Sequence, residues 1–348
     1  MSKSARRAIG AQPSRSLGVD PLRYSIPGIG SEDRGVLPPR RGPAPHDLRE
    51  SLVGMDRQLT FVTVDVFASR VLEGNPLAVF PDSGELSRDE MQAIAREFNL
   101  SETTFVFRRD RPTERADGIR TRIFTTNEEL PFAGHPTLGT ATVLREQGTV
   151  DNVVLELNVG KVPVRFSKVQ GPSFGEMTQI DPTFGRVHDR GQIADAMGVS
   201  AEELDATLPI QTVSTGVPFA IVPFVRLSAL QQWTPSWNQM HEYLRRTDAK
   251  YFYAISRETV ASDAQVHARM VFYGGEDPAT GGAAGPAAAW LVQNKVVDSG
   301  TQIQIEQGLE ASRPSRIFAR ADLTGEKVTN VRVGGYCVPV LRGELRLS

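Results

Sequence analysis

The sequence predicts an α+β protein built from two similar domains, because one strand–turn–helix plan occurs twice along the chain. Residues 134–141 (GHPTLGTA) and 277–283 (DPATGGA) share the pattern [H/D]-P-x-x-G-x-A, and each opens into an alanine-rich run that favours a helix. Residues 74–80 and 216–222 share a Gly-x-Pro turn followed by an apolar segment. The spacing between the two patterns is the same in both halves: Gly74 precedes His135 by 61 positions, and Gly216 precedes Asp277 by 61 positions. The period is too long for a solenoid repeat and indicates a duplicated domain.

The composition is that of a globular protein with room for two domains. The chain has 348 residues, of which 40% are hydrophobic and 23% are charged, and its formal net charge is −2. This charge gives no electrostatic reason to expect nucleic acid, and no apolar run approaches the ~18 residues of a membrane span. A single cysteine, Cys337, excludes an internal disulfide, a cysteine-based metal site and a two-cysteine mechanism. It favours a reducing, cytoplasmic location.

Residues 1–56 differ from the rest of the chain. They are rich in Arg, Pro, Gly and Ser, lack apolar periodicity and contain no apolar stretch typical of a secretory signal. We expect a disordered or dispensable extension, or a leader upstream of a start at Met55. The first domain is then expected over residues 57–190 and the second over 191–348, with the last strand as a candidate to return to the first domain.

In the first half, alternation of apolar and polar residues with period two predicts strands, and Ser87 is typical of a helix N-cap. The expected strands are 61–67, 77–80, 103–107, 119–125, 153–157, 162–166 and 177–184, the last leading to a linker. The expected helices are 88–98 and a second one that follows the glycine-rich turn and ends near Gln147. Residues 108–118 are expected to form a polar loop.

The second half follows the same plan. Short helices are expected at 192–197 and 201–204, and strands at 211–214, 301–306, 316–319 and 331–341. The apolar segment after Gly216 corresponds to the strand after Gly74. A turn over residues 307–315 separates two of the strands.

Motifs for several classes of protein are missing. There is no Gly-x-x-x-x-Gly-Lys-[Ser/Thr] loop and no Gly-x-Gly-x-x-Gly after a strand. The five histidines show no metal-ligand spacing. These patterns give no support for nucleotide binding or for a histidine-based metal site. What remains is acid–base chemistry by carboxylates and histidine.

Glu102 is the first candidate for such chemistry. It lies in a short polar segment, NLSETT (residues 99–104), between an expected amphipathic helix and an expected apolar strand. Desolvation there would raise the pKa of the carboxyl group, so that it could give and take a proton near neutral pH. The alternative is an ordinary surface glutamate in a turn.

His135 and Asp277 are the next candidates, because each precedes a proline and begins a glycine-rich turn. The free N–H groups of a helix start would attract the carboxylate of a substrate. Helix capping explains one such residue well, but two at matched positions favour function.

Five charged residues near these turns allow two interpretations. Glu128, Glu129 and Glu276 could orient a substrate amine, or they could be solvated loop carboxylates. Arg122 and Arg269 could bind a carboxylate, or they could pair with neighbouring acids.

These motifs, in this order, resemble the PhzF-like family of phenazine-biosynthesis isomerases, within the diaminopimelate-epimerase fold group. The resemblance covers the chain from about residue 61 to the C-terminus. The segments that carry it are VDVF (64–67), GNP (74–76), NLSET (99–103), FT (124–125), ELPFAGHP (129–136), GEDPATG (275–281), QG (307–308) and RPS (313–315).

The resemblance implies two domains, each a β-barrel-like sheet wrapped around a central helix, with the active site in the cleft between them. It implies a homodimer that works without cofactor or metal. Glu102 would carry the proton, with His135 and Asp277 assisting. The residues expected to bind the substrate, a small carboxylate, are Ser101, Gly134, Thr280, Gly281 and Gly282. The family isomerises trans-2,3-dihydro-3-hydroxyanthranilate, moving a proton from C3 to C1 while domain closure excludes water.

Two departures bear on the substrate. Gly282 stands where the family often has serine, and Ser312 stands where glycine is usual. We therefore expect a PhzF-like isomerase of a small cyclic, amino or hydroxy carboxylate. The alternatives are an epimerase or racemase that uses Glu102 and Asp277 as opposed bases, or a non-catalytic carboxylate-binding protein.

Overall fold

The computed structural model describes residues 57–148, 152–167, 173–273 and 275–347. The extension expected over residues 1–56 lies outside the described residues. Among the helices that are described, none is long and apolar enough to cross a membrane.

The first half of the described chain contains eight strands and three helices. The strands are β1 (Arg57–Val66), β2 (Asn75–Phe80), β3 (Glu102–Phe107), β4 (Ile119–Phe124), β5 (Glu129–Leu130), β6 (Asn152–Leu157), β7 (Gly160–Phe166) and β8 (Ser173–Thr178). The helices are α1 (Arg88–Phe98), α2 (Arg111–Asp117) and α3 (Gly134–Gly148).

The second half of the described chain contains ten strands, four α-helices and a short 3-10 helix. The strands are β9 (Thr183–Val187), β10 (Gln211–Ser214), β11 (Pro218–Phe224), β12 (Tyr251–Ser256), β13 (Val266–Arg269), β14 (Val271–Phe272), β15 (Gly275–Glu276), β16 (Ile303–Gln307), β17 (Ser315–Thr324) and β18 (Lys327–Leu347). The helices are α4 (Arg190–Met197), a 3-10 turn (Ala201–Glu203), α5 (Leu227–Gln232), α6 (Trp237–Leu244) and α7 (Gly281–Gln293).

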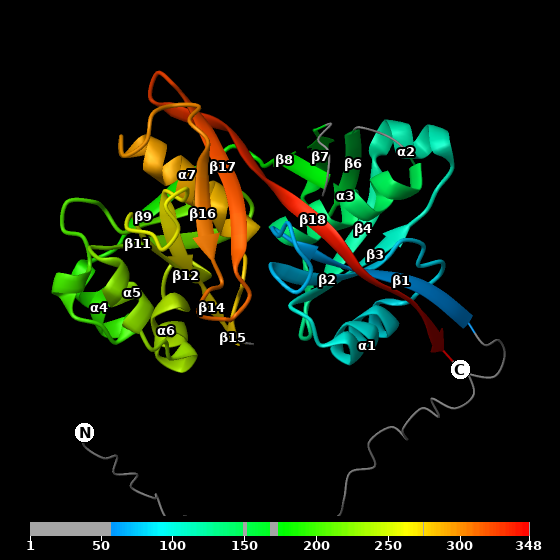
Figure 1. Cartoon of the computed structure of the whole chain (residues 1–348), viewed down its shortest axis with the longest axis horizontal. Coiled ribbons are helices and arrows are strands. Elements are labelled where there is room, and N and C mark those ends of the chain that lie inside the picture. Colours follow the sequence, from blue (N-terminus) through cyan, green and yellow to red (C-terminus); the bar gives the residue numbers. More distant parts are fainter. Residues whose placement is uncertain (1–56, 149–151, 168–172, 274, 348) are drawn as a thin grey trace, which may run out of the picture. The chain divides into compact units, whose positions relative to one another are not determined.

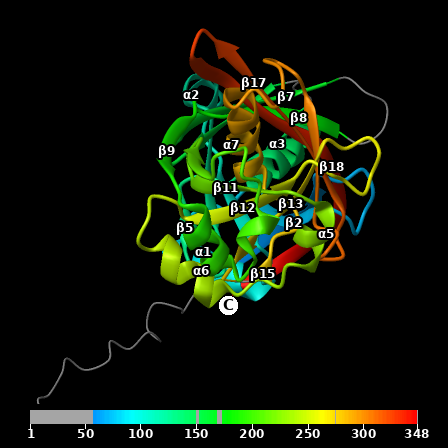
Figure 2. The same ribbon diagram turned by 90° about the vertical axis from the view of Figure 1, so that its left-hand side faces the viewer.

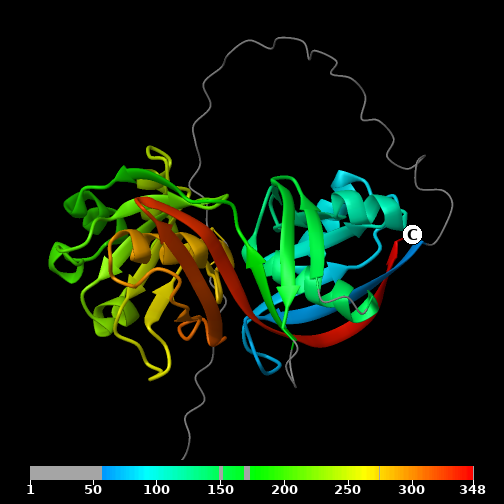
Figure 3. The same cartoon turned by 90° about the horizontal axis from the view of Figure 1, so that it is seen from above.

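Strand β18 joins the two halves, and Figures 1 and 3 show it in red running from one to the other. The order β1-β2-β3-β4-β6-β7-β8-β18 closes on itself, because β18 also pairs with β1. This closed sheet surrounds α3, whose residues 134–144 are all buried. The order β18-β17-β16-β13-β12-β11-β10-β9 continues from the same strand, and α7 packs against β10, β11, β17 and β18.

The two sheets follow the same sequence of pairings. The parallel pairs β2–β3 and β4–β6 correspond to the parallel pairs β11–β12 and β13–β16. The intervening β3–β4 and β12–β13 pairs are both antiparallel. The prediction of two similar domains, each a sheet wrapped around a central helix, is therefore confirmed.

The register of the repeat differs from the one that the motifs suggested. Phe124 pairs with Glu129, and Val271 pairs with Glu276, so equivalent residues are 147 positions apart (124 to 271, 129 to 276). The helix starts Gly134 and Gly281 keep the same shift. The expected equivalence of His135 and Asp277 is therefore wrong. His135 is the second residue of α3, whereas Asp277 precedes α7 by four residues.

Most of the expected elements occur, and two predictions need correction. Helix α1 begins after Ser87, which forms a capping box with Glu90, as its sequence indicates. The expected polar loop after β3 instead contains α2, capped by Asp110; none of its residues is buried, so it has no apolar periodicity to detect. The strand expected over 177–184 is two strands, β8 and β9, because the chain leaves one sheet there and enters the other.

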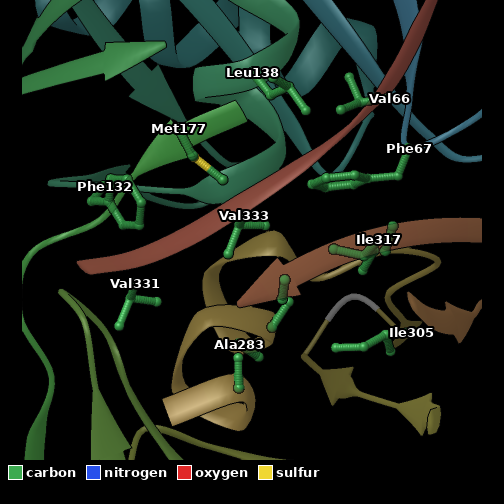
Figure 4. Packing of buried hydrophobic residues seen from close by; sticks show 14 of the residues in the cluster. Val66, Phe67, Phe132, Leu138, Met177, Ala283, Ile305, Ile317, Val331 and Val333 are labelled. Atoms are coloured by element: carbon green, nitrogen blue, oxygen red, sulfur yellow. The ribbon is translucent and has the colours of Figure 1, made fainter. Parts of the chain in front are cut away.

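The largest hydrophobic cluster spans both halves and lies on both sides of β18. It contains Leu138 of α3, Ala283 of α7 and Val333 of β18, which Figure 4 shows together. Small residues line the two central helices where strands approach closely. At Gly139, for example, a Cβ atom would lie 2.7 Å from Leu77 Cδ2. Helices α3 and α7 contact each other, and both contact β18; Figure 2 shows the two helices side by side in the middle of the molecule.

Candidate active site

One pocket contains all eight of the site residues that the sequence indicates. Residues from both halves line it, and the space between them, counted together with its open mouth, is about 620 Å³. The sequence-predicted residues in its lining are Ser101, Glu102, Gly134, His135, Asp277, Thr280, Gly281 and Gly282. The fold therefore gathers motifs that are up to 181 positions apart in the sequence (101 to 282).

Glu102 begins β3, where parallel pairing with Leu77 of β2 fixes its backbone. Its side chain is only 15% exposed. Burial raises its pKa well above the usual range, and the charge of Asp277 adds to this effect. The carboxyl group therefore holds a proton at a pH where an exposed glutamate would not.

His135 faces Glu102 from the first turn of α3. Its Nε2 atom lies 3.4 Å from Glu102 Oε2. Both atoms are buried and lack a hydrogen-bond partner among the described residues. Burial lowers the pKa of His135 to about 3, so the imidazole is neutral at pH 7. Two unpaired polar atoms that face one pocket are suited to a ligand that hydrogen-bonds to both.

Asn75 is a site residue that our sequence reasoning missed. It begins β2, is fully buried, and its Nδ2 atom lies 2.7 Å from Asp277 Oδ1 and 3.2 Å from His135 Nδ1. Because an amide nitrogen can only donate, Nδ1 acts as the acceptor and the ring proton is on Nε2, facing Glu102. One sequence feature could have indicated Asn75 as a site residue, namely a polar side chain between a glycine and a proline at the start of an apolar strand.

Asp277 lies in the loop between β15 and α7. Its Oδ2 atom accepts a 2.6 Å hydrogen bond from Thr280 Oγ1. Burial raises its pKa to about 7, although the hydrogen bonds from Thr280 and Asn75 act in the opposite direction. Asp277 can therefore exchange a proton near neutral pH.

Gln307 holds the Asp277 loop in place and is a second residue to which the sequence assigned no role. Its Nε2 atom donates to the Asp277 carbonyl at 2.7 Å and lies 2.8 Å from Thr280 Oγ1. Its Oε1 atom accepts from the Thr280 N–H at 3.1 Å. The side chain is fully buried, so this amide fixes the loop from the interior.

The two helix starts meet at the floor of the pocket. A Cβ atom on Gly134 would lie 2.4 Å from the Gly281 carbonyl carbon, and one on Gly281 would lie 2.7 Å from Phe67 Cζ. Both positions therefore require glycine. A Cβ atom on Gly282 would have its nearest neighbours at 3.9 Å, so a small side chain fits there.

The two arginines near the turns are engaged in ion pairs. Arg122 binds Glu129 through two contacts of 2.8 and 2.5 Å, and Arg269 binds Glu276 through two contacts of 2.8 Å. Of the two interpretations, pairing with neighbouring acids is therefore the observed one for these four residues. Glu128 instead lies 3.3 Å from Lys250 at the pocket.

The remaining wall is largely aromatic, and our sequence reasoning did not anticipate it. Phe132 of the first half and Phe219, Tyr251 and Tyr273 of the second half all line the pocket. The Tyr273 hydroxyl lies 2.8 Å from Thr125 Oγ1, which makes a contact between the halves. Such a wall suits a flat or cyclic ligand. Across the described part of the chain, no group of three or more His, Cys, Asp or Glu side chains could hold a metal ion.

Comparison with known proteins gives a consistent result over most of the chain. A family model described as phenazine biosynthesis-like protein matches residues 64–343. The trans-2,3-dihydro-3-hydroxyanthranilate isomerase of Pseudomonas aeruginosa is 38% identical over 280 residues, covering 79% of this chain and 95% of its own. An uncharacterized isomerase of Mesorhizobium japonicum is 37% identical over 298 residues, covering 82% of this chain and 98% of its own.

Solved structures agree with these relatives. A phenazine biosynthesis protein of the PhzF family from Bacillus anthracis has a TM-score of 0.73 and 27% identity, covering 83% of this chain and 99% of its own. A probable proline racemase from Agrobacterium radiobacter shares the fold, with a TM-score of 0.60 at 12% identity, covering 83% of this chain and 93% of its own. The chain therefore belongs to the phenazine biosynthesis-like (PhzF) family, and it is an isomerase with the diaminopimelate epimerase-like fold.

Proposed function

We propose that the protein isomerises a small cyclic amino or hydroxy carboxylate by carrying one proton on Glu102, in the manner of a trans-2,3-dihydro-3-hydroxyanthranilate isomerase. The observation that carries this proposal is the buried contact of 3.4 Å between Glu102 Oε2 and His135 Nε2 inside a pocket that both halves line. The relatives that bear the name of that isomerase support the choice of substrate class.

The geometry supports a division of labour among three side chains. Glu102, as the carboxylate, takes a proton from a ring carbon of the substrate and returns it to a second carbon, while the double bonds shift between them. Neutral His135 offers its Nε2–H to the substrate atom on which negative charge develops. Asp277, with a pKa of about 7, is suited to exchange a proton with a substrate hydroxyl or amino group as an enol becomes a ketone. Burial keeps the carried proton from exchanging with water.

The substitution Glu102→Gln tests this proposal, because an amide keeps the shape of the side chain and cannot carry the proton. Turnover of trans-2,3-dihydro-3-hydroxyanthranilate, followed by NMR, should fall by about 10²-fold or more, while an aromatic analogue should bind nearly as tightly as before. Glu156→Gln is a matched control, since Glu156 forms an ion pair with Arg109 outside the pocket. Turnover in Glu102→Gln within twofold of the unaltered protein would contradict the role of Glu102.

A second candidate is an epimerase of a small amino or hydroxy acid with Glu102 and Asp277 as its two bases. It is favoured by one observation, namely that two carboxyl groups with raised pKa values line the same pocket. Incubation of amino and hydroxy acids in D₂O separates the two reactions. Deuterium at a stereocentre without migration of a double bond would favour the epimerase, whereas a shifted double bond would favour the isomerase of the main proposal.

A further inference from the structure

Lys250 stands out among the residues that line the pocket. Of the lining residues that the structure describes, it is the only lysine or arginine. The ionisable side chains deeper in the pocket are Glu102, His135 and Asp277. Burial favours the neutral form of all three, so Lys250 carries the permanent charge of the lining.

A hydrogen bond fixes the backbone of Lys250, whereas its ammonium group is partly exposed and can change position. Its N–H donates to the Pro218 carbonyl at 2.9 Å, which anchors it where β12 begins beside β11. The ammonium group lies 5.5 Å from the centre of the Tyr251 ring, and the side chain is 40% exposed. The charge is therefore held at the mouth of the pocket, against its aromatic wall.

Glu128 reaches the same ammonium group from the other half of the molecule, with its Oε1 atom 3.3 Å from Lys250 Nζ. A tight turn fixes the backbone of Glu128, since its N–H donates to Thr125 Oγ1 at 2.9 Å and its carbonyl accepts from the Thr125 N–H at 2.8 Å. The Glu128 side chain is 48% exposed, and ion pairs between exposed groups contribute little to stability. Another carboxylate can therefore replace Glu128 on Lys250 at small cost.

We propose that Lys250 binds the carboxylate of the substrate and that Glu128 competes with the substrate for it. This inference rests on the proposed function and adds a specificity-determining residue to it. The substrates are then small acids with a flat or cyclic body against Tyr251 and a carboxylate at the pocket mouth. Neutral compounds of the same shape would lack this contact. The contact also orients the ring, because the carboxylate and the carbon that faces Glu102 are parts of one rigid molecule.

Binding of anthranilate, a ring with one carboxylate and one amine, tests this assignment when it is compared with aniline, which lacks the carboxylate. Trp237 can report binding by fluorescence, because its ring lies 6.0 Å from that of Tyr251 and 6.4 Å from that of Tyr273. Lys250→Met should weaken anthranilate binding about tenfold, and Lys250→Arg should restore most of it. Glu128→Gln should tighten it severalfold, because the competing carboxylate is gone. Aniline binding should be the same in all variants.

Lys161→Met is the matched control, since Lys161 is an exposed lysine paired with Asp117 at 3.6 Å and lies outside the pocket lining. If Lys250 and Glu128 merely held the two halves together, Lys250→Met and Glu128→Gln would change anthranilate binding in the same direction. That result, or unchanged binding in Lys250→Met, would overturn the assignment.

The assignment and the proposed reaction can fail separately. If the unaltered protein bound anthranilate through Lys250 but isomerised no ring acid, the result would contradict the proposed reaction and support the role of Lys250. If the unaltered protein isomerised a ring acid and Lys250→Met kept the same KM for that substrate, the result would support the proposed reaction and contradict the role of Lys250.

Discussion

At the scale of single residues, burial sets the chemistry of the pocket. It raises the pKa of Glu102 and Asp277 and lowers the pKa of His135, so all three favour their neutral forms. Asn75 then determines which nitrogen of His135 carries the proton, because its amide faces Nδ1. An anionic substrate thus meets less negative charge than two exposed carboxylates would present, and the raised pKa of Glu102 makes its carboxylate form a stronger base for the proposed proton transfer.

The raised pKa of Asp277 predicts how stability depends on pH. The carboxyl group has a pKa of about 7 in the folded protein and 3.8 as its model value, so the folded state binds this proton more tightly than the unfolded state does. The stabilisation of the folded state by the proton on Asp277 is fully present below about pH 4 and is lost as the pH rises through about 7. Asp277→Asn should therefore raise the free energy of unfolding at pH 8 by about 4 kcal/mol and change it little at pH 4.

Urea unfolding at the two pH values measures this effect. Asp205→Asn serves as the control, because Asp205 lies outside the pocket lining and its side chain accepts hydrogen bonds from the nearby Thr207. A variant Asp277→Asn that is equally destabilised at pH 4 and pH 8 would mean that the hydrogen bonds of Asp277, rather than its buried charge, dominate its effect on stability.

At the scale of elements, the starts of α3 and α7 shape the pocket floor. A Cβ atom on Gly134 would clash with the Gly281 backbone and one on Gly281 would clash with the Phe67 ring, whereas the position of Gly282 has room for one. Both helix starts line the pocket and neither helix has an acidic residue in its first turn, so the positive ends of both helix dipoles lie at the pocket. The glycines of the two motifs thus have different functions, although they look alike in the sequence.

Substitutions by serine at these two positions should separate these functions. Gly282→Ser should fold normally and change the KM or the choice among ring acids, because a hydroxyl group then points into the pocket. Gly281→Ser should lower the free energy of unfolding by about 2 kcal/mol or more, because the Phe67 ring or the start of α3 must move. Thermal unfolding and steady-state kinetics of both variants measure these effects. If both serine variants were destabilised equally, this would contradict the inference that position 282 has room for a side chain and position 281 does not.

At the scale of the whole molecule, Arg313 connects the two halves beside the active site. It lies between β16 and β17, and its guanidinium donates to Asp65 Oδ1 at 2.6 Å and to the Gly74 carbonyl at 2.7 Å. Gly74 precedes Asn75, whose amide binds both His135 and Asp277. The contact between the halves and the arrangement of the site therefore depend on the same arginine.

Arg313→Met should affect stability and activity together. Removal of the guanidinium leaves Asp65, which is 3% exposed, without its ionic partner, so the free energy of unfolding should fall by about 3 kcal/mol. The kcat should fall as well, since the Gly74–Asn75 backbone loses a partner. Arg316→Met is the control, because Arg316 pairs with Asp263 at the surface. An Arg313→Met variant that is destabilised but keeps the kcat of the unaltered protein would show that Asn75 is positioned without Arg313.

Local patterns made much of the fold predictable. The capping box at Ser87, the hairpin of β6 and β7 and the alternation in β1 depend on neighbouring residues, so they can be read directly from the chain. Helix α2 was missed because an exposed helix has no buried face to detect. The register of the repeat was misjudged because the His-Pro and Asp-Pro motifs resemble each other while standing at different distances from their helices.

By itself, the sequence determined the family, the two-domain plan and the eight residues that gather in the pocket, because these depend on residue types and their order. Only the tertiary structure decided that Asn75 and Gln307 hold the site together, that Arg122 and Arg269 are engaged in ion pairs and that Lys250 lies at the pocket mouth. The physical reason is that burial and long-range contacts set these properties. Asn75 and Asp277 are 202 positions apart, and no local pattern records that they meet.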